Sequence, residues 1–462
     1  MVASRTPAGA LGLKPKQARP DASAAALPGL AVRLTATAIL RQVVERGVPL
    51  DTLLGEAQGN PHFAALDQRD RALVRAIVGT ALRRRGEIEN ALSRVLDRPL
   101  PADSGALHGI LHVAAAQILF LDVPDHAAVN LAVAQAAGDR RTGRARGLVN
   151  GVLRHLVRER DDILARPDAP RLNVPDWLFE RWAAAYGDAT ATEIARSHLT
   201  LPALDLSVKS DPAGWAEKLG GTSLPTGGIR LSGTQPVAEL PGYDEGAWWV
   251  QDAAAALPSK LLGDVAGKEV ADLCAAPGGK TAELSAAGAN VTALDISKSR
   301  LKRLGENLRR LGLDARLTQA DLLAWEPGEA FDAVLLDAPC SSTGTIRRHP
   351  DIPWLKHLQD IDTLSALQAK MLNRAAALVR PDGLLVYSTC SLEPEEGVEQ
   401  IAPFLLRHPE FMLLPIDPAE LMGLGHLISP QGMLRTLPCQ SLGEGAVMQG
   451  MDGFFAARFR RA

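Results

Sequence analysis

The stretch VADLCAAPGGKTAEL, residues 270–284, decides how the second half of the chain folds. An apolar run typical of a buried strand leads into a turn that contains Pro277, Gly278 and Gly279, and a helical segment follows. Glycines let a ligand approach the backbone closely, and proline stiffens the turn. The turn matches neither the G-x-G-x-x-G of dinucleotide folds nor the P-loop, so by itself it indicates a ligand only weakly.

Strand-like and helical segments alternate around this unit from about Trp248 onward. The strand-like runs are KEVADLC, ANVTALDI, ARLTQAD, FDAVLLDAP, LLVYSTC and GFFAARFR, with helical segments such as SRLKRLGENLRRLG between most of them. This alternation predicts a parallel, doubly wound α/β sheet. Ligands of such sheets bind beyond the carboxyl ends of the strands. Five reactive or polar side chains fall there: Asp272, Asp295, Asp321, Asp337 and Cys390.

The acids at these strand ends favour an adenosine-type ligand. Asp295 ends the second strand at about twenty residues from the turn, where an acidic residue accepts ribose hydroxyls in dinucleotide folds. Asp321 closes the third strand, near the expected adenine. The acids would repel a pyrophosphate, so we expect S-adenosylmethionine (SAM), which has a sulfonium cation and no phosphate. Lys280 is available for its carboxylate.

Two cysteines stand at strand ends, Cys340 after FDAVLLDAP and Cys390 at the end of LLVYSTC. A thiolate that adds to C6 of cytosine makes C5 able to attack a sulfonium methyl group, which is covalent nucleophilic catalysis. Asp337, three residues before Cys340, suits a contact with N3 if its protonated form is favoured by burial or by nearby acids. Either thiol lies at the right edge of the sheet, so this chemistry alone does not choose the nucleophile.

The composition limits the other functions. The chain has 462 residues, of which 46% are apolar, and this size predicts two or three domains. Its four cysteines lack the C-x-x-C and C-x-x-H spacings of zinc sites, so we expect reduced thiols, no metal and a cytoplasmic protein. No apolar run is long enough to span a membrane. A net charge of −3 neither indicates nor excludes nucleic-acid binding.

Four regions are predicted along the chain. Residues 1–29, rich in Ala, Pro and Gly, form a disordered tail. Residues 30–165 form an all-α domain, because RDRALVRAIVGTALRRRGEIENALSRVL carries one apolar stripe with arginines outside and ALHGILHVAAAQILFL is an almost wholly apolar helix. Residues 166–245 form a small α+β subdomain, and residues 246–462 form the α/β domain.

The motifs CAAPGGK (274–280), LLDAPCSSTG (335–344) and YSTCSLEPEEG (387–397) resemble the signatures of the Nop/Sun family of RNA 5-methylcytosine methyltransferases. The final MDGFFAARFRR resembles that family's last strand, which implies an antiparallel strand at the end of a Rossmann-like sheet. Upstream, AAVNLAVAQAA and GLVNGVLRHL resemble the NusB-like domain of the bacterial Sun/Fmu type, which methylates 16S ribosomal RNA. The strand LDLSVK departs from the family's pattern, so no role is transferred there.

The resemblance implies a role for each matched residue. Cys390 would be the nucleophile, Cys340 would assist release of the covalent adduct, and Asp337 would contact the target base and the methyl donor. Asp295 would bind ribose and Asp321 would lie near adenine. The residues implied to line SAM are Cys274, Ala275, Ala276, Pro277, Gly278, Gly279 and Lys280.

The remaining cysteines and acids receive plainer interpretations. Cys274 is expected to pack without reacting, and Cys439 to be a small buried side chain. EPEEG, after Cys390, is interpreted as the acidic first turn of a helix.

The expected partner is RNA, bound by a monomer. Basic residues cluster at 83–85, 139–146 and 346–351, and TGTIRRHP is the best candidate for phosphate contact because it follows the Asp337–Cys340 motif. His349 is a candidate base or a phosphate contact. Two alternatives stay open: the same chemistry on tRNA or DNA, where the DNA version would make Cys340 the nucleophile, and a non-enzymatic RNA-binding assembly factor.

Overall fold

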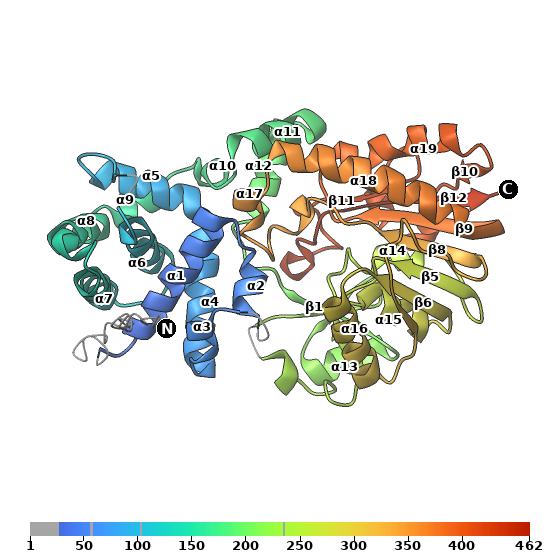
Figure 1. The fold of residues 1–462 in the computed structure, drawn as a ribbon, viewed down its shortest axis with the longest axis horizontal. Coiled ribbons are helices and arrows are strands. Elements are labelled where there is room, and N and C mark those ends of the chain that lie inside the picture. The colour runs from blue at the N-terminus through green and yellow to red at the C-terminus, as the bar shows by residue number, and fades with distance from the viewer. Residues whose placement is uncertain (1–26, 56–58, 102–103, 234–235) are drawn as a thin grey trace, which may run out of the picture.

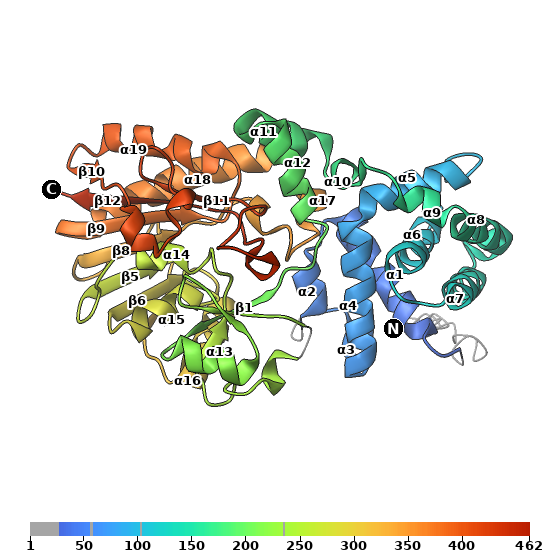
Figure 2. The ribbon, with the colours of Figure 1, turned by 180° about the vertical axis from the view of Figure 1, so that it is seen from behind.

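The computed structural model describes residues 27–55, 59–101, 104–233 and 236–462. Residues 1–26, most of the tail predicted to be disordered, lie outside the described residues. Figures 1 and 2 show an elongated molecule, with the helices of the first part of the chain at one end and a large sheet at the other. No helix in the described part of the chain combines the length and the apolar character needed to cross a membrane.

The first part of the chain is a helical bundle around α6 (Leu107–Phe120), nearly all of whose residues are buried. An apolar helix of this kind needs partners on every side, and the other helices pack around it in one hydrophobic core. These are α1 (Leu30–Arg46), α2 (Leu50–Leu54), α3 (Pro61–Ala64), α4 (Gln68–Arg83), α5 (Arg85–Val95), α7 (Asp125–Gly138), α8 (Arg146–Arg158) and α9 (Arg160–Leu164).

The apolar stripe predicted between residues 69 and 96 is divided between α4 and α5, because the chain bends at Arg84. The bend brings Gly86 against the backbone of Leu172, where an added Cβ would lie 1.7 Å from the carbonyl oxygen. Among the arginines expected outside this stripe, Arg83 is half-buried and faces the α/β domain. Its guanidinium donates to the Arg347 carbonyl oxygen (2.9 Å), which belongs to the α/β domain.

A small sheet follows three connecting helices, α10 (Ala169–Leu172), α11 (Asp176–Tyr186) and α12 (Asp188–Ser197). Its strand order is β2-β3-β1-β4, with antiparallel pairing throughout. The elements are β1 (Leu204–Val208), α13 (Pro212–Leu219), β2 (Thr222–Ser223), β3 (Ile229–Leu231) and β4 (Trp248–Val250). This sheet therefore extends beyond residue 245.

The large sheet has the order β10-β12-β9-β8-β5-β6-β7, with β11 also paired to β12. The strands β5, β6, β7, β8 and β9 pair in parallel, and β12 pairs antiparallel with β9, β10 and β11. The predicted Rossmann-like sheet with an antiparallel last strand is confirmed. The strands are β5 (Glu269–Leu273), β6 (Asn290–Asp295), β7 (Arg316–Gln319), β8 (Phe331–Asp337), β9 (Val379–Thr389), β10 (Phe411–Leu413), β11 (Leu434–Thr436) and β12 (Phe454–Arg461).

Both faces of the sheet are buried, as the apolar strands require. Alternate residues of β8 enter different cores: Val334 and Leu336 pack with α18 and α19, whereas Leu335 packs on the opposite face with α14. Figure 1 shows α18 and α19 along one side of the sheet. The helices of this domain are α14 (Leu257–Lys260), α15 (Gly279–Ala286), α16 (Lys298–Leu311), α17 (Ile352–Leu355), α18 (Leu358–Ala377) and α19 (Ile401–Arg407).

A loop that leads into α17, residues 345–355, contacts the helical bundle. Asp351 accepts a hydrogen bond from the Leu50 amide (2.8 Å), and the Trp354 indole donates to the Leu82 carbonyl (3.0 Å). The same loop begins just after the LLDAPCSSTG motif. The helical bundle is therefore in direct contact with the segment that follows the first thiol.

Candidate active site

The glycine-rich turn lies between β5 and α15, and its backbone explains its composition. Gly278 has φ +104°, a conformation that residues with a side chain rarely adopt, and an added Cβ would lie 2.7 Å from Cγ of Leu304. Gly279 is the first residue of α15, so the turn leads directly into a helix N-terminus. Cys274 also has positive φ, at 62°.

A pocket of about 510 Å³ opens beside this turn, a volume within the range of small-molecule sites. It brings together Ala275, Ala276, Pro277, Gly278, Gly279, Lys280, Asp337 and Cys390 of the predicted site. It is also lined by residues that were not selected from the sequence, including Gln251, Asp252, Asp272, Arg348, Asp452 and Phe454. Among the predicted residues, Cys274, Asp295, Asp321 and Cys340 are not part of the lining.

Asp295 lies against the turn, because its Oδ2 accepts a hydrogen bond from the Ala276 amide (3.2 Å). Its Oδ1 accepts from the Ser297 amide (2.8 Å), and the side chain is buried. Asp321 is exposed at the end of β7, and its carboxylate accepts from the Leu323 amide (3.0 Å). The structure therefore brings Asp295 to the turn and leaves Asp321 outside the pocket lining.

Asp272 was expected at a strand end, but it was not among the residues predicted for the site. It is fully buried, and its Oδ2 accepts a hydrogen bond from Thr281 (2.5 Å). Its Oδ1 has no hydrogen-bond partner among the described residues. Burial raises the pKa of Asp272 to about 7. An unpaired buried acceptor in the wall of a pocket fits a ligand that brings a donor.

The two thiols meet at the ends of adjacent parallel strands. In the register of β8 and β9, Asp337 is opposite Ser388, so the residues that follow each strand are neighbours. Sγ of Cys340 lies 3.4 Å from Sγ of Cys390. The hydrogen bond from Cys340 lowers the pKa of Cys390 below its ordinary value and raises that of Cys340 well above it. Cys390, the thiol that lines the pocket, is thus the one favoured as thiolate.

Asp337 is held between two donors. The Lys280 ammonium donates to Oδ2 (2.8 Å), and the Ser388 hydroxyl donates to Oδ1 (3.0 Å). Burial lowers the pKa of Lys280, but the Asp337 carboxylate outweighs this and raises it. The nearest charged partner of Asp337 is therefore a cation, whereas nearby acids were envisaged from the sequence. Lys280, expected to serve the carboxylate of SAM, is engaged by Asp337.

The two thiol loops are joined by Glu396, whose role the sequence did not reveal. Glu396 is fully buried and accepts hydrogen bonds from the Ser341 amide (2.8 Å), the Ser391 hydroxyl (2.6 Å), the Gln368 amide group (2.9 Å) and the Ser341 hydroxyl. EPEEG forms a 3₁₀ turn at Pro394–Glu396 and does not start an α-helix, so the earlier interpretation is wrong. Each serine directly follows a cysteine, so Glu396 fixes both thiols.

The guanidinium groups of TGTIRRHP are paired within the protein. Arg348 binds Asp252 and Asp452 (2.9 Å to the latter), and Arg347 lies 3.5 and 3.4 Å from the same two acids. His349 contacts Asp51 of the helical bundle (3.2 Å), and this contact raises the pKa of the imidazole. The segment borders the pocket, as expected. Its arginines bind buried carboxylates, because Asp252 and Asp452 would otherwise be uncompensated charges.

The other two cysteines differ from this pair. Burial raises the pKa of Cys274 to about 12, so it stays a thiol, and burial also raises the pKa of Cys439. Thiolate chemistry requires deprotonation, so neither environment activates a nucleophile.

Comparisons with known proteins agree with this geometry. The family model described as 16S rRNA methyltransferase RsmB/F matches residues 260–460, and that of the NusB family matches residues 30–158. The ribosomal RNA small subunit methyltransferase B of Vibrio vulnificus is 37% identical over 401 residues, covering 83% of this chain and 92% of that protein. Its counterpart in Klebsiella pneumoniae is 36% identical over 444 residues, covering 92% and 97%.

Solved structures resemble the chain over similar lengths. The crystal structure of PH0851 has a TM-score of 0.69 and 25% identity, and covers 94% of this chain and 99% of its own. A methyltransferase homolog from Pyrococcus horikoshii has a TM-score of 0.52 and 28% identity, covering 63% and 97%.

Fold and pocket thus define a SAM-dependent methyltransferase. More narrowly, the chain belongs to the ribosomal RNA small subunit methyltransferase B family. The resemblance inferred from the motifs, the NusB-like domain and the cofactor are thereby confirmed.

Proposed function

We propose that this protein methylates C5 of a cytosine in 16S ribosomal RNA through a covalent bond between Cys390 and C6. The observation that carries the proposal is the pair of thiols 3.4 Å apart, with Cys390 in the wall of the pocket and Cys340 behind it. The family description and the small-subunit rRNA methyltransferase relatives support the choice of RNA. Activity in the cytoplasm and action as a monomer remain part of the proposal.

Cys390 is the proposed nucleophile. Its thiolate forms a bond to C6, which gives C5 enamine character, and SAM, when bound, supplies an electrophilic methyl group. Once C5 has been methylated and has lost its proton to a base, the C6–S bond breaks and the thiolate leaves. Cys340 assists this release, since it is in hydrogen-bond contact with the Cys390 sulfur. Asp337, anchored by Lys280 and Ser388, contacts the base.

The turn and the acids around it would hold SAM. The backbone from Ala275 to Gly279 would contact the cofactor, and the turn keeps its shape because a Cβ at Gly278 would clash with Leu304. The unpaired Oδ1 of Asp272 is a suitable acceptor for the ammonium group of SAM. Asp295 is proposed for the ribose hydroxyls, since each carboxylate oxygen can accept a second hydrogen bond. Asp321 is proposed for the adenine side.

The proposal is tested with purified protein, 16S rRNA and methyl-tritiated SAM, followed by digestion of the RNA to nucleosides. The expected product is labelled 5-methylcytidine. Cys390→Ala should abolish labelling, and Cys340→Ala should accumulate a protein–RNA adduct that survives denaturing electrophoresis. Cys439→Ala is the matched control, because that thiol lies outside the pocket. Methylation by Cys390→Ala would overturn the assignment, and label only in tRNA would overturn the substrate.

A further inference from the structure

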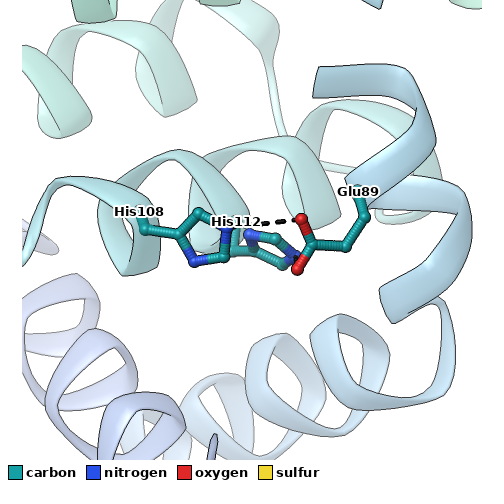
Figure 3. Close-up of side chains that lie close together, drawn as sticks. All are labelled: Glu89, His108 and His112. Carbon is teal, nitrogen blue, oxygen red and sulfur yellow. Dashed lines mark hydrogen bonds and ion pairs between the residues drawn. The ribbon is translucent and has the colours of Figure 1, made fainter. Parts of the chain in front are cut away.

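Two histidines and a glutamate converge in the helical bundle, far along the chain from the methyltransferase motifs. His108 and His112 are four residues apart on α6, so both rings leave the same face of that helix. Glu89 approaches them from α5. Figure 3 shows the three side chains pointing toward one another between the two helices.

The spacing of these side chains matches that of ligands around one ion. Nε2 of His108 lies 3.3 Å from Oε2 of Glu89, and Nε2 of His112 lies 3.5 Å from Oε1. Ligand atoms about 2.1 Å from a tetrahedral zinc ion are roughly 3.4 Å apart. One ligand atom from each residue can be chosen so that all three lie within 4.8 Å of one another. His108, whose side chain is 42% exposed, can rotate to close the remaining distance.

A second, independent observation concerns His112. The residue is 2% exposed, and neither ring nitrogen has a hydrogen-bond partner among the described residues. Buried polar atoms are normally satisfied, so an imidazole without a partner, aimed at a carboxylate and a second imidazole, requires an explanation. A metal ion that binds Nε2 would supply a partner for that nitrogen.

From this we infer that Glu89, His108 and His112 form a binding site for a zinc-like divalent transition-metal ion. Two imidazoles and one carboxylate suit Zn²⁺, whereas Mg²⁺ and Ca²⁺ prefer oxygen ligands. The prediction of no metal rested on the cysteines, which lack the spacing of zinc sites. It does not apply to this set of two histidines and a glutamate. The fourth position would be taken by water, which can reach the set because His108 is 42% exposed and Glu89 also lines a pocket of about 560 Å³.

The site would join two helices next to the contact between the domains. The Arg85 side chain lies 3.6 Å from Glu89, and its guanidinium carbon is 4.8 Å from the ring centre of Trp354 in the α/β domain. An ion that bound Glu89 would fix the end of α5 from which Arg85 reaches Trp354. The inference is a structural role for the metal and is independent of the proposed reaction.

The experiment measures Zn²⁺ binding to the chelator-treated full chain by calorimetry. A Cys340→Ser/Cys390→Ser background removes the thiol pair as a competing ligand. We expect one equivalent of Zn²⁺ to bind and affinity to fall at least tenfold in Glu89→Gln and in His108→Gln, both partly exposed positions where the fold should tolerate the change. His155→Gln is the matched control, because His155 lies 4.0 Å from Glu159, just past the end of its helix, with no third ligand among the described residues.

Bound Co²⁺ gives a second readout. Tetrahedral Co²⁺ absorbs visible light, and thiolate ligands add a charge-transfer band that nitrogen and oxygen ligands do not give. That band should be absent, and the visible absorption should be lost in His108→Gln. Equal Zn²⁺ affinity in the background chain, Glu89→Gln and His108→Gln would overturn the inference, as would binding that depends on His155. Failure here leaves the methylation assay unaffected, so the two proposals are judged separately.

Discussion

Replacing Glu396 by glutamine should destabilise the α/β domain. Glu396 does not line the pocket, so the substitution alters no pocket-lining residue. The carboxylate is fully buried and accepts hydrogen bonds from Ser341, Ser391 and Gln368. Every group that faces it is a donor. A carboxamide replaces one acceptor oxygen by a donor nitrogen, so at least one donor on that side loses its partner.

The magnitude follows from the bonds that are lost. A hydrogen bond to a charged group contributes about 1.5–3 kcal/mol, and an unsatisfied buried group costs about 1–3 kcal/mol. We therefore expect Glu396→Gln to lower the free energy of unfolding by about 3 kcal/mol. At a urea dependence of about 3 kcal/mol per molar, the unfolding midpoint should fall by about 1 M.

Urea unfolding followed by circular dichroism measures this shift, with Glu395→Gln as the matched control. Glu395 is the preceding residue, its side chain is one-third exposed, and it pairs with Arg181 (2.6 Å). Ion pairs that are open to solvent contribute about 1 kcal/mol or less, so this partly exposed pair should contribute less than the fully buried Glu396 network. Equal midpoints for Glu396→Gln and Glu395→Gln would show that the buried carboxylate does not hold the two thiol loops together.

Three further outcomes are expected. Diamide should join Cys340 and Cys390 in a disulfide, because their sulfurs are 3.4 Å apart, and a reductant should restore both thiols; a thiol titration that does not fall would contradict this. Burial raises the pKa of Asp272 to about 7, so the stability that its protonated form contributes is full below pH about 4 and is lost as pH rises through 7. Asp272→Asn should therefore flatten the pH dependence of Tm between about pH 4 and 7. An unchanged profile would argue against the raised pKa. Gly344→Ala should cost about 2–3 kcal/mol in urea unfolding, since its Cβ would lie 2.1 Å from the Gly453 carbonyl oxygen; wild-type stability would disprove the close approach.

The sequence predicts what depends on local pattern. Alternating strands and helices are enough to predict the parallel sheet, and the motifs are enough to bring Cys340 and Cys390 to one edge of it. The turn from Pro277 to Gly279 is predictable for the same reason, because its chemistry is contained in a few consecutive residues. Such features need no knowledge of distant partners.

What the sequence did not predict depends on partners far away in the chain. Glu396 looks like the start of a helix until Ser341, 55 residues earlier, is placed against it. Arg348 looks like a phosphate contact until Asp252 and Asp452, about a hundred residues away on either side, are seen to neutralise it. The two histidines of ALHGILHVAAAQILFL gain significance only when α5 brings a carboxylate to them. A signal was present in their four-residue spacing, but the ligand that completes it is on another helix.

The position of β12 has a consequence for synthesis on the ribosome. This strand is the last one of the described chain, yet it lies inside the sheet between β9 and β10. Until it has emerged, the nascent chain presents β9 as an open edge, and β10 has no place to attach. Unpaired edges invite pairing with other chains. The helical bundle can fold early, whereas the sheet is completed only by its final strand, so the interval before β12 appears is when a chaperone would matter most.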